Sequence, residues 1–346
     1  MRKIKGFIRI GFMNKIVTFF RRVASGSFKR FFRNLNIVHK ESGKSRLWLF
    51  FSMIFSMFRY GIGYLDYMTF GFAYIKRDKR LTFMTMDDNL SLARRLNNPE
   101  ANPTFTDKLN FNRTFRDYLK RDFVDLNDGF TAFESFCQGK TCFFAKEPSS
   151  FGGLGVMKVS LENADLKELY EQLKAKKLFL AEEAIVQHEE MNKLCRRSVN
   201  TIRIVTVLSD KGNANFVYAL IRVGSGKNDV DNVTSGGMYT LLSEKGEITH
   251  PLFCDKTVSY YTVHPNTGAE FIGFKVPYFA EALELCKNAA KVEKRMRYVG
   301  WDVAITPTGP VLVEGNNLPG YDMCQNHRFH DSGEGMKAAF EFAEKN

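Results

Sequence analysis

The sequence lacks long hydrophobic runs and paired cysteine motifs. Its most hydrophobic stretch, LWLFFSMIFSMF at 47–58, covers 12 residues between Arg46 and Arg59, whereas a helix needs about 20 apolar residues to cross a bilayer. We therefore expect a buried helix or a helix at a membrane interface there, and no secretory signal before it. The six cysteines form no CxxC or CxxH pair, so we expect reduced thiols in a cytoplasmic protein rather than a zinc site or disulfides.

Internal repeats and low-complexity tracts are also missing. Charged residues make up 25% and hydrophobic residues 44% of the 346 positions, which excludes a disordered chain and leaves room for two or three subdomains. Helical and strand-like patterns mix along the chain. The segments are two strands around a glycine loop at 141–160, a helix from Asn163 to 177, two strands within 198–223, and a helix at 278–295. The predicted fold class is α+β or α/β.

Acidic residues are absent from the first 40 positions, which carry eleven of the 50 Lys and Arg residues. The other 39 stand against 38 acidic residues, so the net charge of +12 belongs to an N-terminal arm. Apolar residues recur in the arm at roughly helical spacing, which fits a basic helix lying on an anionic membrane, peripheral to its inner face. The alternatives are a helix packed on its own domain with a solvated basic face, or contact with a polyanionic substrate.

Acidic and amide side chains flank two short apolar strands in WDVAITPTGPVLVEGNNLPG, near the C-terminus. Residues 303–305 and 311–313 are predicted to pair as a hairpin, with Asp302 at the start of the first strand and Glu314 at the end of the second. Glu314 and Asn316 point to the same face of an extended strand, and hairpin pairing places Asp302 across from them. Three oxygen donors at one end of a sheet suit Mg²⁺. The alternative is a pair of surface acids beside a turn, which the apolar strands disfavour.

A lysine precedes a serine- and glycine-rich stretch in KEPSSFGGLG, where Lys146 ends a predicted strand. Such a loop can place an ammonium group and several backbone N–H groups on phosphate oxygens. It is not a Walker A motif, because no GK[ST] follows and no helix starts there. A plain β-hairpin with a glycine turn is the alternative. A second lysine, Lys108, lies at the start of a helix that Thr106 or Asp107 is predicted to cap.

Taken in order, these elements resemble the ATP-grasp superfamily. The order is Lys108 in TDK, Lys146 before the glycine loop, AEEAI, and then Asp302 followed by E-x-N-x-x-P-G, which is typical of the amino-acid ligases of that superfamily. The strings SVNTIRIVTV, ALIRVG and DNVTSGG within 198–237 resemble a segment of glutamate ligases. Residues 104–326, about two-thirds of the chain, resemble the sugar-transfer-associated ATP-grasp family, for which VNTIRIVT, HPNTG and VGWDVAIT…GPVLVEGN are typical.

The resemblance implies an ATP-grasp fold of class α+β (α/β) with a helical, basic N-terminal extension. The implied domains are a basic amphipathic arm at 1–45, a helical region at 46–103 and an ATP-grasp domain at 104–346. Within the last domain, the lid subdomain would cover about 137–182 and the catalytic core about 183–330.

The resemblance also implies roles for individual residues. Those implied to bind ATP, through its phosphates, adenine or ribose, are Lys108, Lys146, Ser149, Ser150, Gly152, Gly153, Gly155, Glu182, Glu183, Ile185, His188 and Asn200. Those implied to neutralise the transferred phosphoryl group or to stabilise an oxyanion are Arg203, Arg222, Asn232 and Gly320. Those implied to hold two Mg²⁺ ions, for which Mn²⁺ can substitute, are Asp302, Glu314 and Asn316.

The implied activity is a Mg-ATP-dependent carboxylate–amine ligase that forms an acyl phosphate, with no nucleic-acid partner. The family association points to adding an amino-acid-like group to a sugar, capsule or exopolysaccharide precursor. One position departs from D-Ala–D-Ala-type ligases, which carry an Arg where this chain has Gly300. Either Arg203 or Arg222 replaces it, or the acceptor chemistry differs. The alternatives are an ATP-grasp phosphotransferase acting on a small molecule or sugar, and a membrane-docked scaffold that binds nucleotide.

Overall fold

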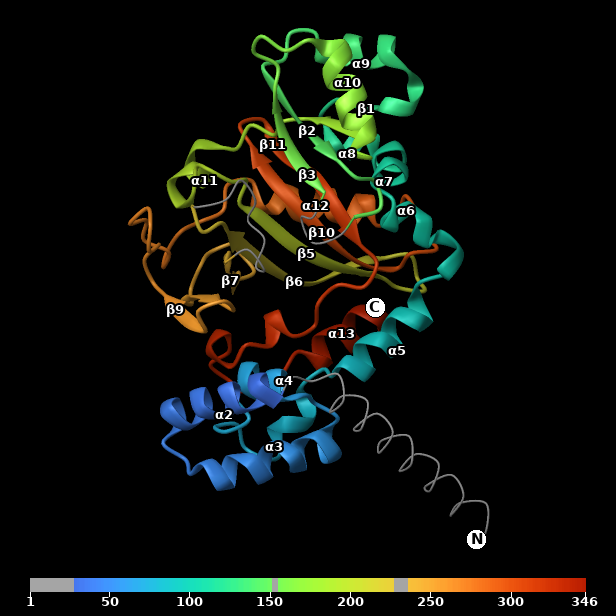
Figure 1. Ribbon diagram of the computed structural model, residues 1–346. Coiled ribbons are helices and arrows are strands. Elements are labelled where there is room, and N and C mark those ends of the chain that lie inside the picture. Colours follow the sequence, from blue (N-terminus) through green and yellow to red (C-terminus); the bar gives the residue numbers. More distant parts are fainter. Residues whose placement is uncertain (1–27, 151–154, 227–235) are drawn as a thin grey trace. The chain divides into compact units, whose positions relative to one another are not determined.

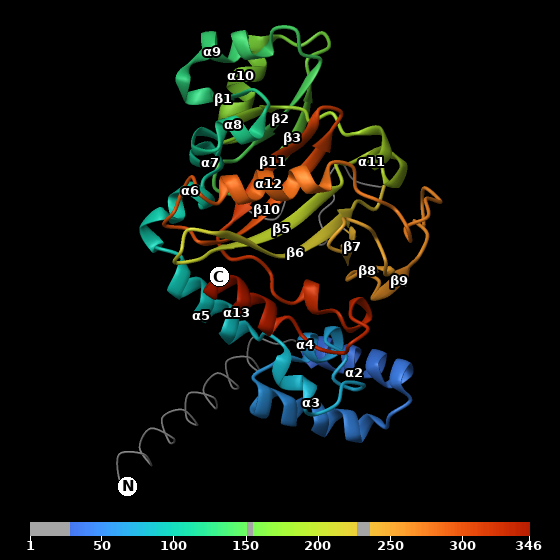
Figure 2. The same cartoon turned by 180° about the vertical axis from the view of Figure 1, so that it is seen from behind.

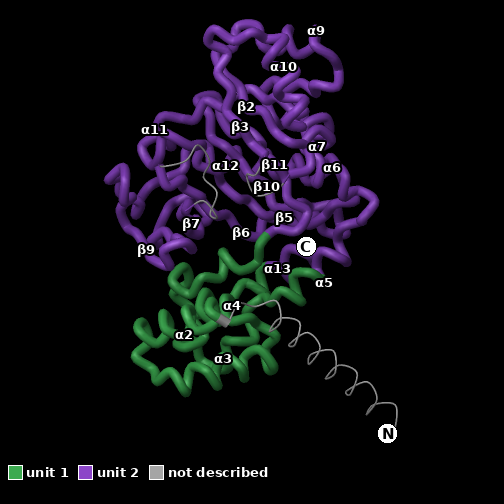
Figure 3. The backbone as a smooth tube through the Cα atoms, viewed as in Figure 1, with its two compact units in different colours: residues 1–91, 320–339 green, residues 92–319, 340–346 purple. Residues whose placement is uncertain are grey.

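The computed structural model describes residues 28–150, 155–226 and 236–346, seen from two opposite sides in Figure 1 and Figure 2. The chain forms two compact units, one of residues 1–91 and 320–339 and the other of residues 92–319 and 340–346 (Figure 3). This division differs from the predicted boundaries at 45/46 and 103/104. Most of the predicted basic arm, residues 1–27, lies outside the described residues.

The first unit is helical, as predicted for the N-terminal region. Its α-helices are α2 (Phe28–Ser42), α3 (Arg46–Tyr60) and α4 (Tyr64–Thr69), together with the first residues of α5 (Met86–Leu96) and α13 (Lys337–Lys345). Three short 3-10 helices complete it: η1 (Lys79–Thr82), η5 (Met323–Gln325) and η6 (His327–Phe329).

Buried polar contacts explain why residues 320–339 belong with the N-terminal helices. The amide of Gln325 donates to Met84 O at 3.0 Å and accepts from Met84 N at 2.8 Å. The hydroxyl of Tyr321 donates to the Asp66 carboxylate at 3.2 Å, and its ring meets Phe70 with centroids 6.4 Å apart. These partners are about 240 to 255 positions apart in the sequence, so local sequence patterns could not predict the grouping.

The second unit is built on a seven-stranded antiparallel sheet in the order β11-β10-β5-β6-β7-β8-β9. The strands are β5 (Thr201–Leu208), β6 (Ala214–Val223), β7 (Met238–Leu241), β8 (Leu252–Cys254), β9 (Ser259–Tyr261), β10 (Tyr298–Thr306) and β11 (Gly309–Asn316). The predicted strand pair within 198–223 and the C-terminal hairpin are therefore both present. Asp302 lies inside β10, however, and not at its start.

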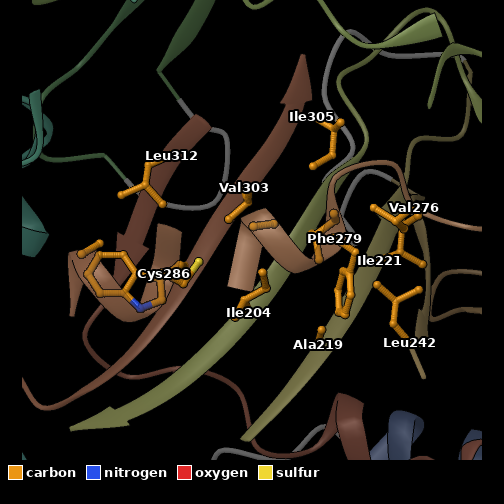
Figure 4. Packing of buried hydrophobic residues seen from close by; sticks show 14 of the residues in the cluster. Ile204, Ala219, Ile221, Leu242, Val276, Phe279, Cys286, Val303, Ile305 and Leu312 are labelled. Atoms are coloured by element: carbon orange, nitrogen blue, oxygen red, sulfur yellow. The ribbon is translucent and has the colours of Figure 1, made fainter. Parts of the chain in front are cut away.

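One face of this sheet packs against α12 (Phe279–Ala289), which runs across the strands (Figure 2). Phe279 and Cys286 of that helix point into an apolar layer that includes Ile204, Ile221 and Val303 (Figure 4). Short helices of the same unit also cover the sheet or connect its parts. They are η2 (Pro99–Ala101), α6 (Asn102–Thr106), α7 (Lys108–Thr114), α8 (Arg116–Leu119) and α11 (Glu189–Leu194).

A smaller four-stranded antiparallel sheet also belongs to the second unit, in the order β1-β4-β2-β3, and is named the lid sheet because it overlaps the predicted lid. Its strands are β1 (Phe123–Asp125), β2 (Cys142–Lys146), β3 (Val156–Ser160) and β4 (Leu180–Glu183), and they are joined by η3 (Leu126–Asp128), α9 (Phe130–Cys137) and α10 (Leu166–Ala175). The first strand of the lid sheet begins at Phe123, before the boundary predicted at 137. Helix α10 begins at Leu166 and not at Asn163, because the Asp165 side chain caps it by accepting from the backbone N–H of Lys167 and Glu168.

Candidate functional site

A β-bulge between β10 and β11 determines where the acidic side chains of the hairpin point. Val303 pairs with Leu312, and both belong to the buried apolar layer. Asp302 pairs with Glu314, so Val313 is an extra residue in β11. Side chains alternate along a strand, and an unbroken β11 would place Glu314 on the apolar face with Leu312. The bulge moves Glu314 to the face that carries Asp302.

Gly315 lets β11 approach the aromatic side of the unit closely. A Cβ atom at this position would lie 2.7 Å from Phe111 Cε2 and 2.8 Å from Phe105 Cε1. The next residue, Asn316, pairs with Gly300, and its amide nitrogen donates to Gly300 O at 3.5 Å. Glu314 and Asn316 therefore share the face opposite to the aromatic rings, across from Asp302, as the hairpin pattern predicts.

Two arginines on neighbouring strands neutralise Asp302. Arg203 of β5 is the direct cross-strand partner of Asp302, and its guanidinium donates to both carboxylate oxygens, with Nη2 2.9 Å from Oδ2. Arg222 of β6 places Nη2 2.6 Å from the same Oδ2 and also donates to Thr201 Oγ1 at 2.8 Å. Burial alone would raise the pKa of Asp302, but the two guanidinium charges outweigh it and hold that pKa below its usual range. The pKa of Arg203 is raised because the attraction of Asp302 exceeds the cost of burial.

The same two arginines compensate the Glu314 carboxyl only in part. Burial raises its pKa, and the adjacent charge and hydrogen bond of Asp302 raise it further. Two carboxyls in contact and an amide on the same face form an oxygen donor set that a divalent cation would fit, because the cation would supply the missing positive charge. Among the described residues, no group of three or more His, Cys, Asp or Glu side chains could hold a metal ion. The amide of Asn316 is therefore needed to complete a three-donor set.

A pocket of about 120 Å³ lies at the edge of β11 in the second unit. Its charged and amide lining residues are Lys108, Lys146, Glu182, Glu314 and Asn316, with Asn112 and Asn317 beside them. Asp302 does not line the pocket and lies behind Glu314, held by the arginines. The structure thus brings together both predicted phosphate-binding lysines and two of the three predicted metal ligands.

Lys146 and Glu182 form an ion pair at the lid side of the pocket. Lys146 Nζ lies 2.5 Å from Glu182 Oε2, and Asn112 Nδ2 donates to Glu182 Oε1 at 2.7 Å. Burial favours the neutral acid, but Lys146 and Arg121 overcome this and lower the pKa of Glu182 to about 2. Glu182 is therefore an anion that holds the lysine at the pocket wall.

Lys108 begins α7, whose N-terminus is capped by Asp107 as predicted, through a hydrogen bond from Asn110 N of 2.9 Å. The ammonium group of Lys108 donates to Glu147 O at 3.2 Å, to Ser150 Oγ at 3.2 Å and to Ser150 O. Burial lowers the pKa of Lys108. The lysine side chain thus fastens the start of the serine–glycine loop to α7.

The rest of the serine–glycine loop is described only in part. Ser149 is exposed in a turn. Gly155 has φ +65°, a left-handed conformation that suits glycine, and its carbonyl accepts from Glu147 N at 2.9 Å. Gly152 and Gly153 lie outside the described residues, as does Asn232.

Arg121 is a site residue that the sequence did not reveal. Its guanidinium donates to Glu182 Oε2 at 3.2 Å, to Val313 O at 3.3 Å and to Leu312 O. It thus joins the lid sheet to the carbonyls of the β11 bulge. Its side chain is 4% exposed, but in the sequence it is one of two adjacent basic residues in LKRDF, and nothing there marks it as buried.

The end of β4 and the linker after it carry most of the residues predicted for adenine and ribose. Glu183 accepts from Asp122 N at 3.1 Å, and its own N–H donates to Asp122 O at 2.9 Å. Ile185 is half-buried in the extended linker. His188 caps α11 by accepting from Glu190 N at 3.1 Å.

Asn200 has a different environment from the pocket residues. It is fully buried, and its amide nitrogen donates to Met191 O at 2.9 Å, Cys195 O at 2.8 Å and Gln187 Oε1 at 3.1 Å, while its oxygen accepts from Gly224 N at 3.3 Å. This geometry fits an internal structural role and offers no free polar atom to a ribose. Gly320, predicted as an oxyanion donor, belongs to the first unit.

Comparison with known proteins places the chain in a family. The sequence pattern described as sugar-transfer associated ATP-grasp matches residues 155–328, half of the chain. No curated protein matches the chain.

Several solved structures are similar at low identity. D-alanine–D-alanine ligase from Bacillus anthracis is 14% identical, with a TM-score of 0.40 and a match that covers 74% of this chain and 73% of that one. The ATP-grasp ligase PsnB, solved with a phosphomimetic variant of its minimal precursor, Mg and ADP, is 13% identical, with a TM-score of 0.40 and coverage of 72% and 62%. N5-carboxyaminoimidazole ribonucleotide synthetase from Thermotoga maritima is 11% identical, with a TM-score of 0.38 and coverage of 68% and 50%.

The last two matches span between half and two-thirds of the other protein's length. Because the family pattern covers half of this sequence, including both arginine-bearing strands and the whole β10–β11 hairpin, the chain belongs to the sugar-transfer-associated ATP-grasp family.

Proposed function

We propose that this chain is a Mg-ATP-dependent ligase that joins a carboxylate to an amine. The observation that carries the proposal is the pocket in which Lys108 and Lys146 meet Glu314 and Asn316. Ammonium groups suit the oxygens of a polyphosphate, and carboxylate and amide oxygens suit a divalent cation that bridges to it. Family membership supports the same assignment.

In this proposal, different residues contact the phosphates, the adenine and the ribose of ATP. Lys146 leaves its ion pair with Glu182, or shares it, to contact a phosphate oxygen, and Lys108 contacts another. The backbone of the linker around Glu183 and Ile185 borders the adenine, with His188 near the ribose. The enclosed volume of about 120 Å³ is smaller than the roughly 300 Å³ of a small ligand pocket. In this proposal, the contact between Lys108 and Ser150 opens to admit ATP.

Glu314, Asn316 and Asp302 would hold the divalent cation. When bound, that cation supplies positive charge to the phosphate oxygens. Arg203 and Arg222 each point at Asp302, and they keep positive charge at the place where the transferred phosphoryl group would carry negative charge.

The proposed reaction has two steps. A carboxylate oxygen of the substrate attacks the γ-phosphorus of ATP, the bond from that phosphorus to the β–γ bridging oxygen breaks, and ADP leaves. The nitrogen of an amine then attacks the acyl carbon, the tetrahedral intermediate expels inorganic phosphate, and the nitrogen loses a proton to form an amide. Arginine charges would stabilise both the phosphoryl transfer and the oxyanion.

The packing around Gly300 bears on why this chain has glycine where D-Ala–D-Ala-type ligases carry an arginine. A Cβ atom on Gly300 would lie 2.8 Å from Pro319 Cβ and 3.1 Å from Arg203 Cδ, so no larger side chain fits there. The stem of Arg203 passes through this space and brings a guanidinium to the same neighbourhood. We infer that Arg203 takes the role that an arginine at position 300 would have.

The family's association with sugar transfer supports a sugar-linked substrate. The proposed product is a sugar or polysaccharide precursor, such as one of a capsule or exopolysaccharide, that carries an amino-acid-like group in amide linkage.

Hydroxylamine trapping tests the reaction type. Carboxylic acids are first screened for substrate-dependent ADP release, and hydroxylamine then replaces the amine. An acyl phosphate yields a hydroxamate together with ADP and inorganic phosphate. ADP formation with a stable phosphorylated product and no hydroxamate would instead identify a phosphotransferase. Nucleotide binding without any ADP release across the screen would identify a nucleotide-binding scaffold.

A further inference from the structure

Helix α3 has two different faces. The buried residues Leu49, Met53 and Ser56 lie on one side. At 100° per residue, Leu47, Trp48, Phe51 and Phe55 fall within one arc of about 100° on the opposite side, and their exposed fractions are 69%, 44%, 61% and 50%. Isolated exposed apolar residues are normal, but a continuous stripe on one helix marks an interaction surface. We call these four residues the α3 stripe.

Basic side chains lie at both ends of helix α3, and Trp48 lies near its start. The helix is capped by Ser45, which accepts from Trp48 N at 3.2 Å, and it ends at Gly61 with φ 72°. Lys44 Nζ lies 4.3 Å from the centroid of the Trp48 ring. Arg46 and Arg59, both exposed, are the only charged residues of the helix and lie at its two ends. This arrangement matches helices that lie in a membrane interface, where basic side chains reach the headgroups and tryptophan lies at the boundary.

The helix is too short to cross a bilayer. Its 15 residues span about 22 Å, against about 30 Å for the hydrocarbon core. Throughout residues 28–150, 155–226 and 236–346, none of the helices has the length and hydrophobicity of a membrane-spanning segment. An in-plane position is the one that the length of α3 allows.

The positive charge around the α3 stripe favours an anionic binding partner. Residues 28–60 contain seven Lys or Arg and one acid, Glu41. A second copy of the chain would bring the same positive excess against the stripe. The sequence of residues 1–27 carries seven Lys or Arg and no acid, so it offers the stripe no opposite charge either. A surface of anionic lipid is apolar inside and negative outside, and it complements both features of the helix.

We propose that the α3 stripe docks in the plane of an anionic lipid membrane. The four apolar side chains enter the boundary between headgroups and acyl chains, and Lys44, Arg46 and Arg59 contact the headgroup phosphates. This site lies in the first unit and is independent of the proposed ligase chemistry.

Flotation of the full chain with vesicles tests the proposal. The vesicles are phosphatidylcholine alone or an equimolar mixture of phosphatidylcholine and phosphatidylserine. The wild-type chain binds the mixed vesicles, and Leu47→Ser/Phe51→Ser/Phe55→Ser weakens that binding at least tenfold, because three large apolar groups no longer leave water. The matched control is Val263→Ser/Ile272→Ser/Phe342→Ser, which removes three scattered apolar residues of similar exposure from the second unit and leaves binding unchanged.

Tryptophan fluorescence locates the contact. The chain has two tryptophans, and Trp301 is buried, so Trp48 reports on the stripe. Mixed vesicles shift the emission to shorter wavelength, and Trp48→Phe removes the shift while the protein still floats. Circular dichroism of the triple variant checks that α3 is still helical.

Equal binding of the triple variant and the wild-type chain would overturn the proposal and assign any lipid contact to other residues. A wild-type chain that binds no mixed vesicles would also overturn it. So would an oligomer that becomes monomeric in the triple variant without lipid, because the occupant would then be a second copy. Since the ligase assay uses soluble substrates and the triple variant keeps its pocket, failure of this proposal and failure of the proposed function are separable.

Discussion

Asp302 and Glu314 face each other across the β10–β11 ladder, with their carboxyl groups in hydrogen-bonding contact, yet their pKa values move in opposite directions. Asp302 has two arginines, and its pKa is lowered; Glu314 has the charge of Asp302 beside it, and its pKa is raised. The two arginines favour the charged form of Asp302 more than that of Glu314, and the proposed cation would supply positive charge to Glu314.

Glu314→Gln is expected to lower the rate of ADP formation by about a hundredfold to a thousandfold, because an amide binds a divalent cation much more weakly than a carboxylate. The rate is measured at saturating Mg²⁺ and ATP. The exposed Glu270→Gln serves as the control for the loss of one negative charge. A Glu314→Gln rate within twofold of the control would remove Glu314 from the cation site.

The two acids are expected to differ in their effect on folding without metal. Asp302→Asn leaves Arg203 and Arg222 without their buried anion and should lower the free energy of unfolding by about 3 kcal/mol or more. Glu314→Gln removes a carboxyl whose ionisation is opposed by burial and by the charge of Asp302, so the free energy of unfolding of this variant should equal or exceed that of the wild-type chain. Urea unfolding with EDTA at pH 7 measures both. Equal destabilisation by the two changes would contradict the charge assignment.

Lys146→Gln is expected to weaken ADP binding about tenfold, through loss of a charged contact to phosphate. Arg121 still pairs with Glu182 in that variant, so the lid sheet keeps one of its cations. Calorimetric titration with Mg-ADP measures the affinity, and Lys158→Gln on the exposed side of β3 is the matched control. If both variants bind ADP like the wild-type chain, Lys146 does not contact the nucleotide.

Glu182 should make stability depend on pH at the acid end. Its pKa is about 2 in the folded chain against 4.5 for the free side chain, so the unfolded chain binds more protons than the folded one between these values. The stabilisation is complete above pH 4.5 and is lost as pH falls towards 2, and it amounts to about 3 kcal/mol.

The difference in the free energy of unfolding between the wild-type chain and Glu182→Gln should therefore shrink as pH falls from 5 to 3. Urea unfolding at several pH values measures this difference. A difference that stays constant over that range would show that Glu182 is not held as an anion.

The sequence predicted the parts of the site that depend on local pattern. Alternation and turn chemistry are enough to pair the two strands of the C-terminal hairpin, but the pairing of Asp302 with Glu314 also needs the bulge at Val313. Asp107 as a helix cap and the strand that ends at Lys146 follow in the same way.

Contacts between distant segments could not be predicted in this way. The bulge at Val313 depends on how β11 meets the rings of Phe105 and Phe111, about 200 positions earlier. Arg121 acquires its role only when the lid sheet reaches β11, and Asn200 is buried by contacts that its neighbours in sequence do not indicate. The exposed side of α3 is a similar case, because hydrophobicity alone left both a buried helix and an interfacial helix open.

Anomalous diffraction from crystals grown with Mn²⁺ and a non-hydrolysable ATP analogue tests the central claim most directly. We predict anomalous peaks bounded by the oxygens of Asp302, Glu314 and Asn316, with the analogue's phosphates between them and the ammonium groups of Lys108 and Lys146. Peaks away from these side chains, or an analogue bound outside this pocket, would contradict the account.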